Sequence, residues 1–201
     1  MTLKEIKKLV TISDGNIKMG SIPSISLPPI VTCNKKAPCT KSGCYALKSF
    51  RIYPSVRQAY NKNLDTFKRS PKEYFNAIDA WLKIKGPSIF RFHVAGDIPN
   101  LTYLSGMIQI AKNNPEIKFL AFSKRYDIIT AAAYIPENLS IIASAWTGLE
   151  MPKHSFPIAW LNDGIENRIP KDAIECHGNC ETCGMCWELK TIKRDVYFNK
   201  H

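Results

Sequence analysis

The chain has 201 residues, and its seven cysteines fall into two groups. The first group is Cys33, Cys39 and Cys44, and the second is Cys176, Cys180, Cys183 and Cys186. An odd number of cysteines and the lack of a recognisable secretory signal argue against a disulfide framework. Clustered thiols in a reducing compartment are instead typical of metal sites. The spacing therefore predicts that all seven are metal ligands.

The C-terminal group has the spacing Cys-x3-Cys-x2-Cys-x2-Cys, which is the bacterial ferredoxin run in reverse order. Such a tight run can surround a cubic cluster, and Gly178 and Gly184 relax the backbone between the ligands. Four-cysteine zinc sites usually consist of two CxxC pairs separated by a longer insert. The run therefore predicts a [4Fe–4S] cluster, with zinc as the alternative.

The N-terminal group offers only three thiols, which leave one iron or one coordination position unfilled. An open position is what a catalytic metal site requires. In the alternative arrangement Cys176 supplies the fourth ligand here, and the other three C-terminal cysteines form the open site. The spacing allows both arrangements.

The sequence between the two cysteine groups predicts strands that alternate with helices, and these elements must position the cysteines. After Cys44 the pattern is helical over 45–67, with a break at Pro54, and again over 71–85, where Ser70 and Glu73 form a capping box. Strands are predicted at 21–29, 89–95, 118–123, 139–146 and 156–161, with helices at 101–113 and 126–134. Five strands are too few for a closed eight-stranded barrel. We therefore predict an α/β fold, a partial (open) parallel βα barrel over 1–163, with a cysteine-rich C-terminal cap of little regular structure over 164–201.

Polar residues follow the predicted strands, where ligands of α/β folds gather. Strand alternation places Phe90, Phe92 and Val94 on one face, and Arg91, His93 and Asp97 on the other. The candidate ligand contacts at the strand ends are Gly96, Asp97, Ser123, Lys124 and Ser144, and the candidate catalytic residues are Asp97, His93 and Lys124. A satisfied structural network of Arg91, His93 and Asp97 is the alternative interpretation.

The composition restricts the class of protein. The net charge is +11 and the sequence pI about 9.3, so either a basic soluble surface or a nucleic-acid partner is expected. No apolar run approaches the ~20 residues of a membrane span. A cytoplasmic protein without a membrane partner is therefore expected.

Two of these features resemble the radical S-adenosylmethionine enzymes. They are the three-cysteine loop directly after the first strand, and the segment Ala95-Gly96-Asp97 at the end of a later strand. The resemblance implies that the three cysteines hold a [4Fe–4S] cluster and that its free iron binds S-adenosylmethionine. The gaps between the cysteines are longer than in that family, and Asp97 stands where a glutamate is usual.

The chain also resembles, over nearly its whole length, a phage-encoded family called gene product 88. The shared segments are Asn16 to Gly20, Ser26 to Pro28, Cys44 to Ala46, His93 to Asp97, Cys183 to Trp187 and Phe198 to His201. This resemblance implies a phage or mobile-element origin and, for a phage-encoded protein, a location in the host cytoplasm, but it implies no reaction.

The leading hypothesis is an iron–sulfur enzyme with two clusters and a small-molecule ligand. The competing hypothesis is a zinc-stapled binding protein that engages nucleic acid or a host protein through its basic surface.

Overall fold

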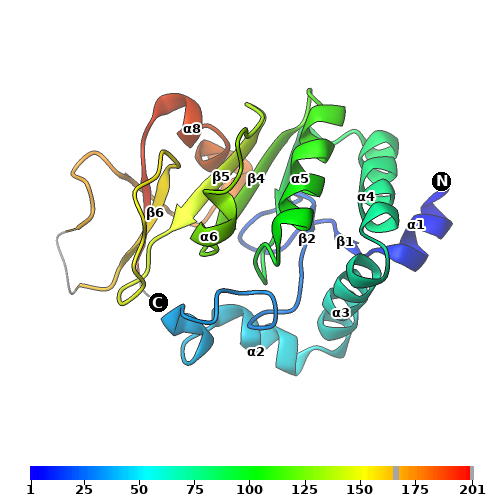
Figure 1. The fold of residues 1–201 in the computed structure, drawn as a ribbon, viewed down its shortest axis with the longest axis horizontal. Coiled ribbons are helices and arrows are strands. Elements are labelled where there is room, and N and C mark those ends of the chain that lie inside the picture. Colours follow the sequence, from blue (N-terminus) through cyan, green and yellow to red (C-terminus); the bar gives the residue numbers. More distant parts are fainter. Residues whose placement is uncertain (165–167, 200–201) are drawn as a thin grey trace.

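The computed structural model describes residues 1–164 and 168–199 and contains an eight-stranded sheet (Figure 1). The strands lie in the order β1-β2-β3-β4-β5-β6-β8-β7, and every pair except β1–β2 is parallel. They are β1 (Ile12–Ser13), β2 (Ser24–Ile25), β3 (Ile89–Phe92), β4 (Lys118–Ser123), β5 (Leu139–Ser144), β6 (Ile158–Asn162), β7 (Ile174–Glu175) and β8 (Val196–Asn199). The predicted α/β class with an open, mostly parallel sheet is confirmed. The strand pairing of the described residues does not identify the sheet as part of a barrel.

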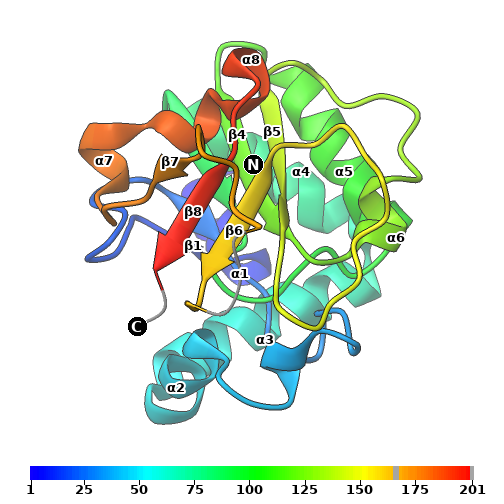
Figure 2. The ribbon, with the colours of Figure 1, turned by 90° about the vertical axis from the view of Figure 1, so that its left-hand side faces the viewer.

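The five predicted strands correspond to β2 through β6, and the sequence prediction missed three others. β1 and β7 have two residues each, and β8 follows the second cysteine group. β8 pairs with β6, and β7 pairs with β8. The C-terminal segment was expected to have little regular structure, but it extends the central sheet by two strands (Figure 2).

Helices cover the sheet on both faces. The helices of the described residues are α1 (Leu3–Leu9), α2 (Tyr45–Ile52), α3 (Pro54–Arg69), α4 (Pro71–Lys85), α5 (Leu101–Asn113), α6 (Tyr126–Ile129), α7 (Cys180–Cys183) and α8 (Leu189–Ile192), with 3-10 turns η1 (Pro38–Thr40) and η2 (Met185–Trp187). Of these, α2 lies below the carboxyl ends of the strands (Figure 1). No helix among the described residues is long and apolar enough to cross a bilayer.

The predicted helix boundaries are largely confirmed by local capping. Pro54 begins α3, and the Ser70 hydroxyl accepts a hydrogen bond from the Glu73 amide at 3.3 Å at the start of α4. Gly86 ends α4 in the left-handed conformation, with φ 56°. The helix predicted at 126–134 is shorter, because α6 ends at Ile129.

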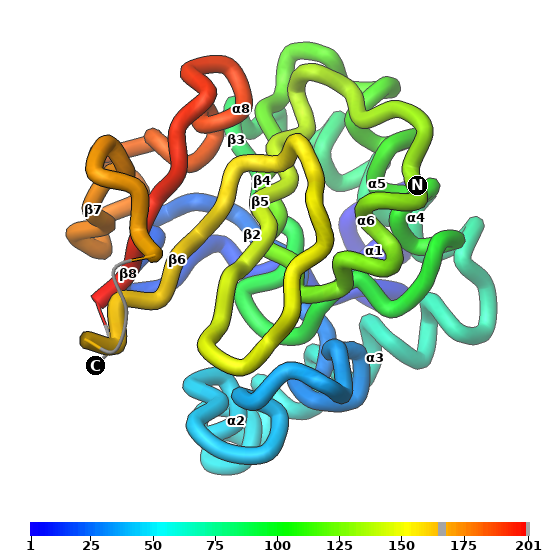
Figure 3. The backbone as a smooth tube through the Cα atoms, turned by 60° about the vertical axis from the view of Figure 1, so that its left-hand side comes forward, coloured from blue at the N-terminus to red at the C-terminus, as the bar shows by residue number. Residues whose placement is uncertain are grey.

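The larger core lies between the sheet and helices α1, α3, α4 and α5 (Figures 1 and 3). Aromatic rings dominate it. Phe90, Phe92 and Phe119 line the sheet, and the rings of Phe67 and Tyr103 meet edge to face at 4.8 Å.

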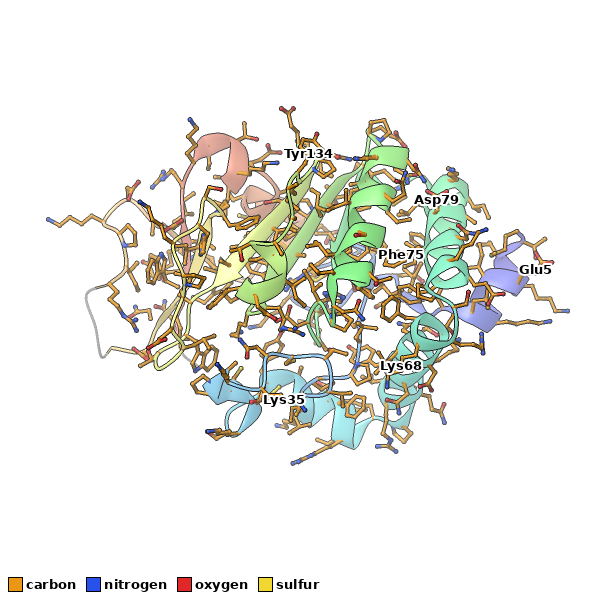
Figure 4. The ribbon with its side chains drawn as sticks, viewed as in Figure 1. Glu5, Lys35, Lys68, Phe75, Asp79 and Tyr134 are labelled. Carbon is orange, nitrogen blue, oxygen red and sulfur yellow. The ribbon has the colours of Figure 1, made fainter. Side chains whose placement is uncertain are left out.

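Phe75 of α4 fills the space beside α5 in the same layer (Figure 4). A Cβ built on Gly106 of α5 would meet its ring at 2.0 Å, so this position requires glycine.

The prediction that His93 shares a face with Arg91 is wrong. β3 ends at Phe92, and His93 adopts a positive φ of 61°, which breaks the alternation of side chains along the strand. The His93 ring therefore turns into the helix-side core, where its Nε2 hydrogen-bonds the Tyr103 hydroxyl at 3.1 Å. Val94, which was predicted to share a face with Phe92, packs instead in the core of the opposite face.

The smaller core lies on the other face of the sheet. It contains Leu120 and Ile142 from the strands, and Trp187 and Leu189 from the C-terminal segment. Three of the C-terminal cysteines pack against it. The C-terminal segment therefore covers the sheet face that α1 and α3–α5 leave open.

Candidate metal centre

The N-terminal cysteine loop lies at the carboxyl edge of the parallel sheet (Figures 1 and 2). The Asn34 side chain donates a hydrogen bond to the Lys124 carbonyl, directly after β4, at 2.9 Å. Thr32 anchors the start of the loop, because its hydroxyl donates to the Pro28 carbonyl and accepts from the Asp97 amide. These bonds hold Cys33 and Cys39 beside the ends of β3 and β4.

Gly96 makes this close approach possible. Its φ is 80°, and a Cβ built there would meet the Leu27 carbonyl oxygen at 2.7 Å and the Thr32 hydroxyl at 2.8 Å. The sequence predicted Gly96 as a ligand contact. In the structure, glycine is required at this position because Leu27 and Thr32, in the segment before the cysteine loop, pack directly against the Gly96 backbone.

The Asp97 carboxylate is buried and accepts hydrogen bonds from one side-chain hydroxyl and two backbone amides. Its Oδ1 accepts from the Ser123 hydroxyl at 2.6 Å and from the Ile98 amide at 2.7 Å, and its Oδ2 accepts from the Lys124 amide at 2.8 Å. Burial raises the pKa of Asp97, and these hydrogen bonds oppose that shift. The predicted neighbours Asp97, Ser123 and Lys124 are thus brought together beside the cysteines.

The three N-terminal thiols lie close enough to influence one another electrostatically. Burial, together with the charges of Asp97, Cys44 and Cys39, raises the pKa of Cys33 to about 12, although the hydrogen bond from the Ile30 amide lowers it. Burial also raises the pKa of Cys39, whereas the positive charge of Lys124 lowers it. Thiolates at these positions would repel one another and the Asp97 carboxylate, so a bound cation would stabilise them.

The Cys33 sulfur accepts a hydrogen bond from the Ile30 amide at 3.3 Å. Ile30 has a positive φ of 69°, which a β-branched residue rarely adopts. Hydrogen bonds to cysteine sulfur stabilise the thiolate and tune clusters that it holds. The strained turn therefore directs a donor at the first thiol of the group.

Replacing Ile30 with glycine will raise the free energy of unfolding by about 0.5–1 kcal/mol, because glycine adopts a positive φ without the Cβ penalty. Urea denaturation measures the change. The matched control is Ile30→Ala, which keeps the Cβ and loses the rest of the side chain, so it will be less stable than the glycine variant. A glycine variant no more stable than the alanine variant would contradict the assigned strain.

Two aromatic residues complete this edge. The Lys124 ammonium lies 5.0 Å from the centroid of the Trp146 ring. The Tyr126 hydroxyl donates to the Ser144 carbonyl, and burial together with the charges of Asp97 and Cys39 raises the pKa of Tyr126 to about 12. Tyr126 was not among the predicted site residues, although it follows the end of β4 by only three positions. Ser144 meets Tyr126 through its backbone carbonyl.

The second cysteine group lies on the face of the sheet that α8 covers. Burial, followed by the negative charges that Cys176 and Cys180 would carry as thiolates, raises the pKa of Cys186 to about 12. Cys183 contributes to the same group and is exposed. The Cys176 amide donates to the Tyr197 carbonyl of β8, which holds this cysteine with the C-terminal group. Of the two arrangements that the spacing allowed, the structure thus brings Cys176 next to Cys180 and Cys186.

The N-terminal turn anchors this second group. The Cys180 amide donates to the Lys18 carbonyl at 3.1 Å, and the Ser21 hydroxyl and amide both donate to the Glu181 carboxylate. Gly20 lies against the Glu181 side chain, which a Cβ at this position would displace. Segments about 160 residues apart in the sequence therefore position α7.

Arg91 places a positive charge beside the second group. Its charge opposes the effect of burial on the pKa of both Cys180 and Cys186. The guanidinium carbon lies 4.9 Å from the centroid of the Phe122 ring, and the buried Nε has no hydrogen-bond partner among the described residues. A half-buried cation beside the Cys180 and Cys186 thiols favours an anionic group at this position. The alternation of β3 correctly separated Arg91 from Phe90 and Phe92.

All seven cysteines are free thiols. Within residues 1–164 and 168–199, no group of three or more His, Cys, Asp or Glu side chains is arranged so that it could hold a metal ion. The two thiol groups fit a soft metal or a cluster by the chemistry of their donors. The thiols of each group would have to move closer to a shared ion.

Comparison with known proteins identifies the family. The family model described as gene product 88 matches residues 2–149. The chain belongs to the gene product 88 family. The match includes the three-cysteine loop and the carboxyl edge, and ends before the second cysteine group. His201, part of the last segment that suggested this family, lies outside the described residues.

No curated protein and no solved structure matches the chain. The gene product 88 resemblance is therefore supported, and the resemblance to radical S-adenosylmethionine enzymes is not.

Proposed function

We propose that this gene product 88 protein is an iron–sulfur protein with two clusters. The first would be held by Cys33, Cys39 and Cys44, and the second by Cys176, Cys180, Cys183 and Cys186. The observation that carries the proposal is that unpaired thiols lie near one another in two separate places, three at the carboxyl edge and four on the sheet face that α8 covers.

The first site favours a role in chemistry. A cluster with three protein thiolates supplies an open iron position for a small-molecule ligand. Asp97 fixes the backbone after β4 and so positions Ser123 and Lys124. The Lys124 side chain, oriented over Trp146 and close to Cys39, supplies a cation for a ligand carboxylate or phosphate. S-adenosylmethionine, which carries such a carboxylate, is the ligand we propose to test first.

His93 has no place in this proposed site. It is buried in the helix-side core, where its Nε2 hydrogen-bonds the Tyr103 hydroxyl, away from the thiol groups. The second site, beside Arg91, is proposed to serve structure or electron transfer.

The test is anaerobic purification followed by iron, acid-labile sulfide and zinc analysis with a visible spectrum. We expect about eight irons with matching sulfide per chain. Replacing the three N-terminal cysteines by alanine will leave about four irons, and so will replacing the four C-terminal ones. Zinc without iron, or a metal-free folded protein, would refute the proposal.

Ligand binding is measured on the same preparation by equilibrium dialysis with labelled S-adenosylmethionine. Binding that requires the three N-terminal cysteines and weakens in Lys124→Ala supports the open site. Iron-loaded protein that binds no S-adenosylmethionine rejects this ligand and leaves the cluster assignment intact.

A further inference from the structure

A segment of the chain without acidic residues surrounds the first site. Between Asp14 and Asp65 there is no aspartate or glutamate, whereas eight lysines and arginines occur there. These eight charges account for most of the net charge of +11. The basic character of the protein is therefore concentrated in one continuous segment.

The fold gathers most of this segment at one edge of the molecule. The cysteine loop and α2 lie together below the carboxyl ends of the strands (Figures 1, 2 and 3), and Figure 4 shows Lys35 at this edge. Six of the basic residues there are exposed: Lys35, Lys36, Lys41, Lys48, Arg51 and Arg57. The ion pairs found among the described residues involve none of these six. We call these six residues, with Tyr45 and Tyr53, the basic edge.

Two aromatic rings lie among these charges. Tyr45 at the start of α2 is 72% exposed, and Tyr53 after its end is 56% exposed. The Tyr45 hydroxyl donates to the Val94 carbonyl, which fixes the ring although its face is open to solvent. A tyrosine ring held in place at the surface is available to stack on a ligand.

The position of α2 is also fixed. The Phe50 ring stacks on Tyr60 of α3 with centroids 6.2 Å apart. The Arg57 guanidinium donates to the Arg51 carbonyl at 3.1 Å, so the end of α2 is capped. The two tyrosines are therefore held at opposite ends of a short helix, with Lys48 and Arg51 between them.

We propose that the basic edge binds single-stranded nucleic acid. Spaced cations contact successive phosphates, and exposed aromatic rings stack on unpaired bases. Base pairs in a duplex hide the faces of the bases, so a duplex would use the charges but not Tyr45 and Tyr53. The inference does not use the proposed clusters, because no cysteine carries it, and the variants that test it, at Lys48, Arg51 and Tyr53, lie outside the cysteine loop.

The experiment is fluorescence anisotropy of a labelled twenty-nucleotide oligothymidine strand, titrated with the full chain as purified at several salt concentrations. Wild-type protein is expected to bind it at least tenfold more tightly than a duplex of equal length. The double variant Lys48→Gln/Arg51→Gln is expected to bind about tenfold more weakly and to reduce the salt slope by about 1.4. The matched control is Lys4→Gln/Lys8→Gln on α1, which removes the same charge from an exposed helix at the other end of the molecule.

Stacking is tested separately at Tyr53, for which Tyr53→Phe is the control. Tyr53→Ala is expected to weaken binding about tenfold, and Tyr53→Phe is expected to bind like wild type. No binding by wild type at 50 mM salt, equal loss in the α1 variant, or a preference for the duplex would overturn the proposal.

Discussion

Replacing Asp97 with alanine will lower the free energy of unfolding by about 3–5 kcal/mol. The substitution leaves the Ser123 hydroxyl and the Ile98 and Lys124 amides without their acceptor in a buried position. Each buried donor without a partner costs about 1–3 kcal/mol. Urea denaturation followed by circular dichroism measures the loss.

The matched control is Asp97→Asn, which keeps the shape and one acceptor oxygen. It will cost about 1–3 kcal/mol, because its amide nitrogen must face one of the former donors. Ordinary surface substitutions change the free energy of unfolding by about 0.5 kcal/mol or less. A change that small for Asp97→Ala would show that Asp97 does not hold the ends of β3 and β4 together.

The second large effect is a loss of stability in acid caused by His93. Burial and the charge of Arg91 lower the pKa of His93 to about 3, against 6.5 in the unfolded chain. Between pH 6.5 and pH 3, His93 therefore binds a proton in the unfolded state but not in the folded state. The stability is fully present above pH 6.5 and falls as the pH drops from there toward 3. Between pH 7.5 and pH 5, His93 alone will lower the free energy of unfolding by about 2 kcal/mol.

His93→Asn is the comparison that isolates this effect. Asparagine tolerates the positive φ at this position and does not titrate. The variant will be less stable than wild type at pH 7.5, because the bond to Tyr103 is lost. Its stability will nevertheless fall by about 2 kcal/mol less than that of wild type between pH 7.5 and pH 5. Parallel pH profiles for the two proteins would contradict a neutral, buried His93.

The first thiol group and the basic edge both lie at the carboxyl edge of the sheet. Cys33 and Cys39 lie beside Asp97 and Lys124, and the basic edge begins at Lys35 in the same loop. A strand of nucleic acid bound on α2 would pass close to the first thiol group. Measuring metal content and oligonucleotide binding on the same variants separates the two activities.

Local signals in the sequence determined the helices and the main strands. Ser70, Gly86 and Pro54 set the ends of α3 and α4 through bonds and backbone angles within a few residues of each boundary. The five strand patterns in the sequence correspond to β2 through β6, although β2 itself has only two residues. β1, β7 and β8 carry no comparable pattern, and they form by pairing with β2, β8 and β6 respectively.

The sequence by itself determined that the thiols form two groups and that polar residues follow the strands. Only the tertiary structure decided that Cys176 lies with Cys180 and Cys186, because the pairing of β7 with β8 positions it. Only the tertiary structure separated His93 from Arg91, since one residue with a positive φ reverses the face that follows it. The spacing of residues shows which of them are neighbours in the sequence, whereas strand pairing and backbone conformation decide which side chains are neighbours in space.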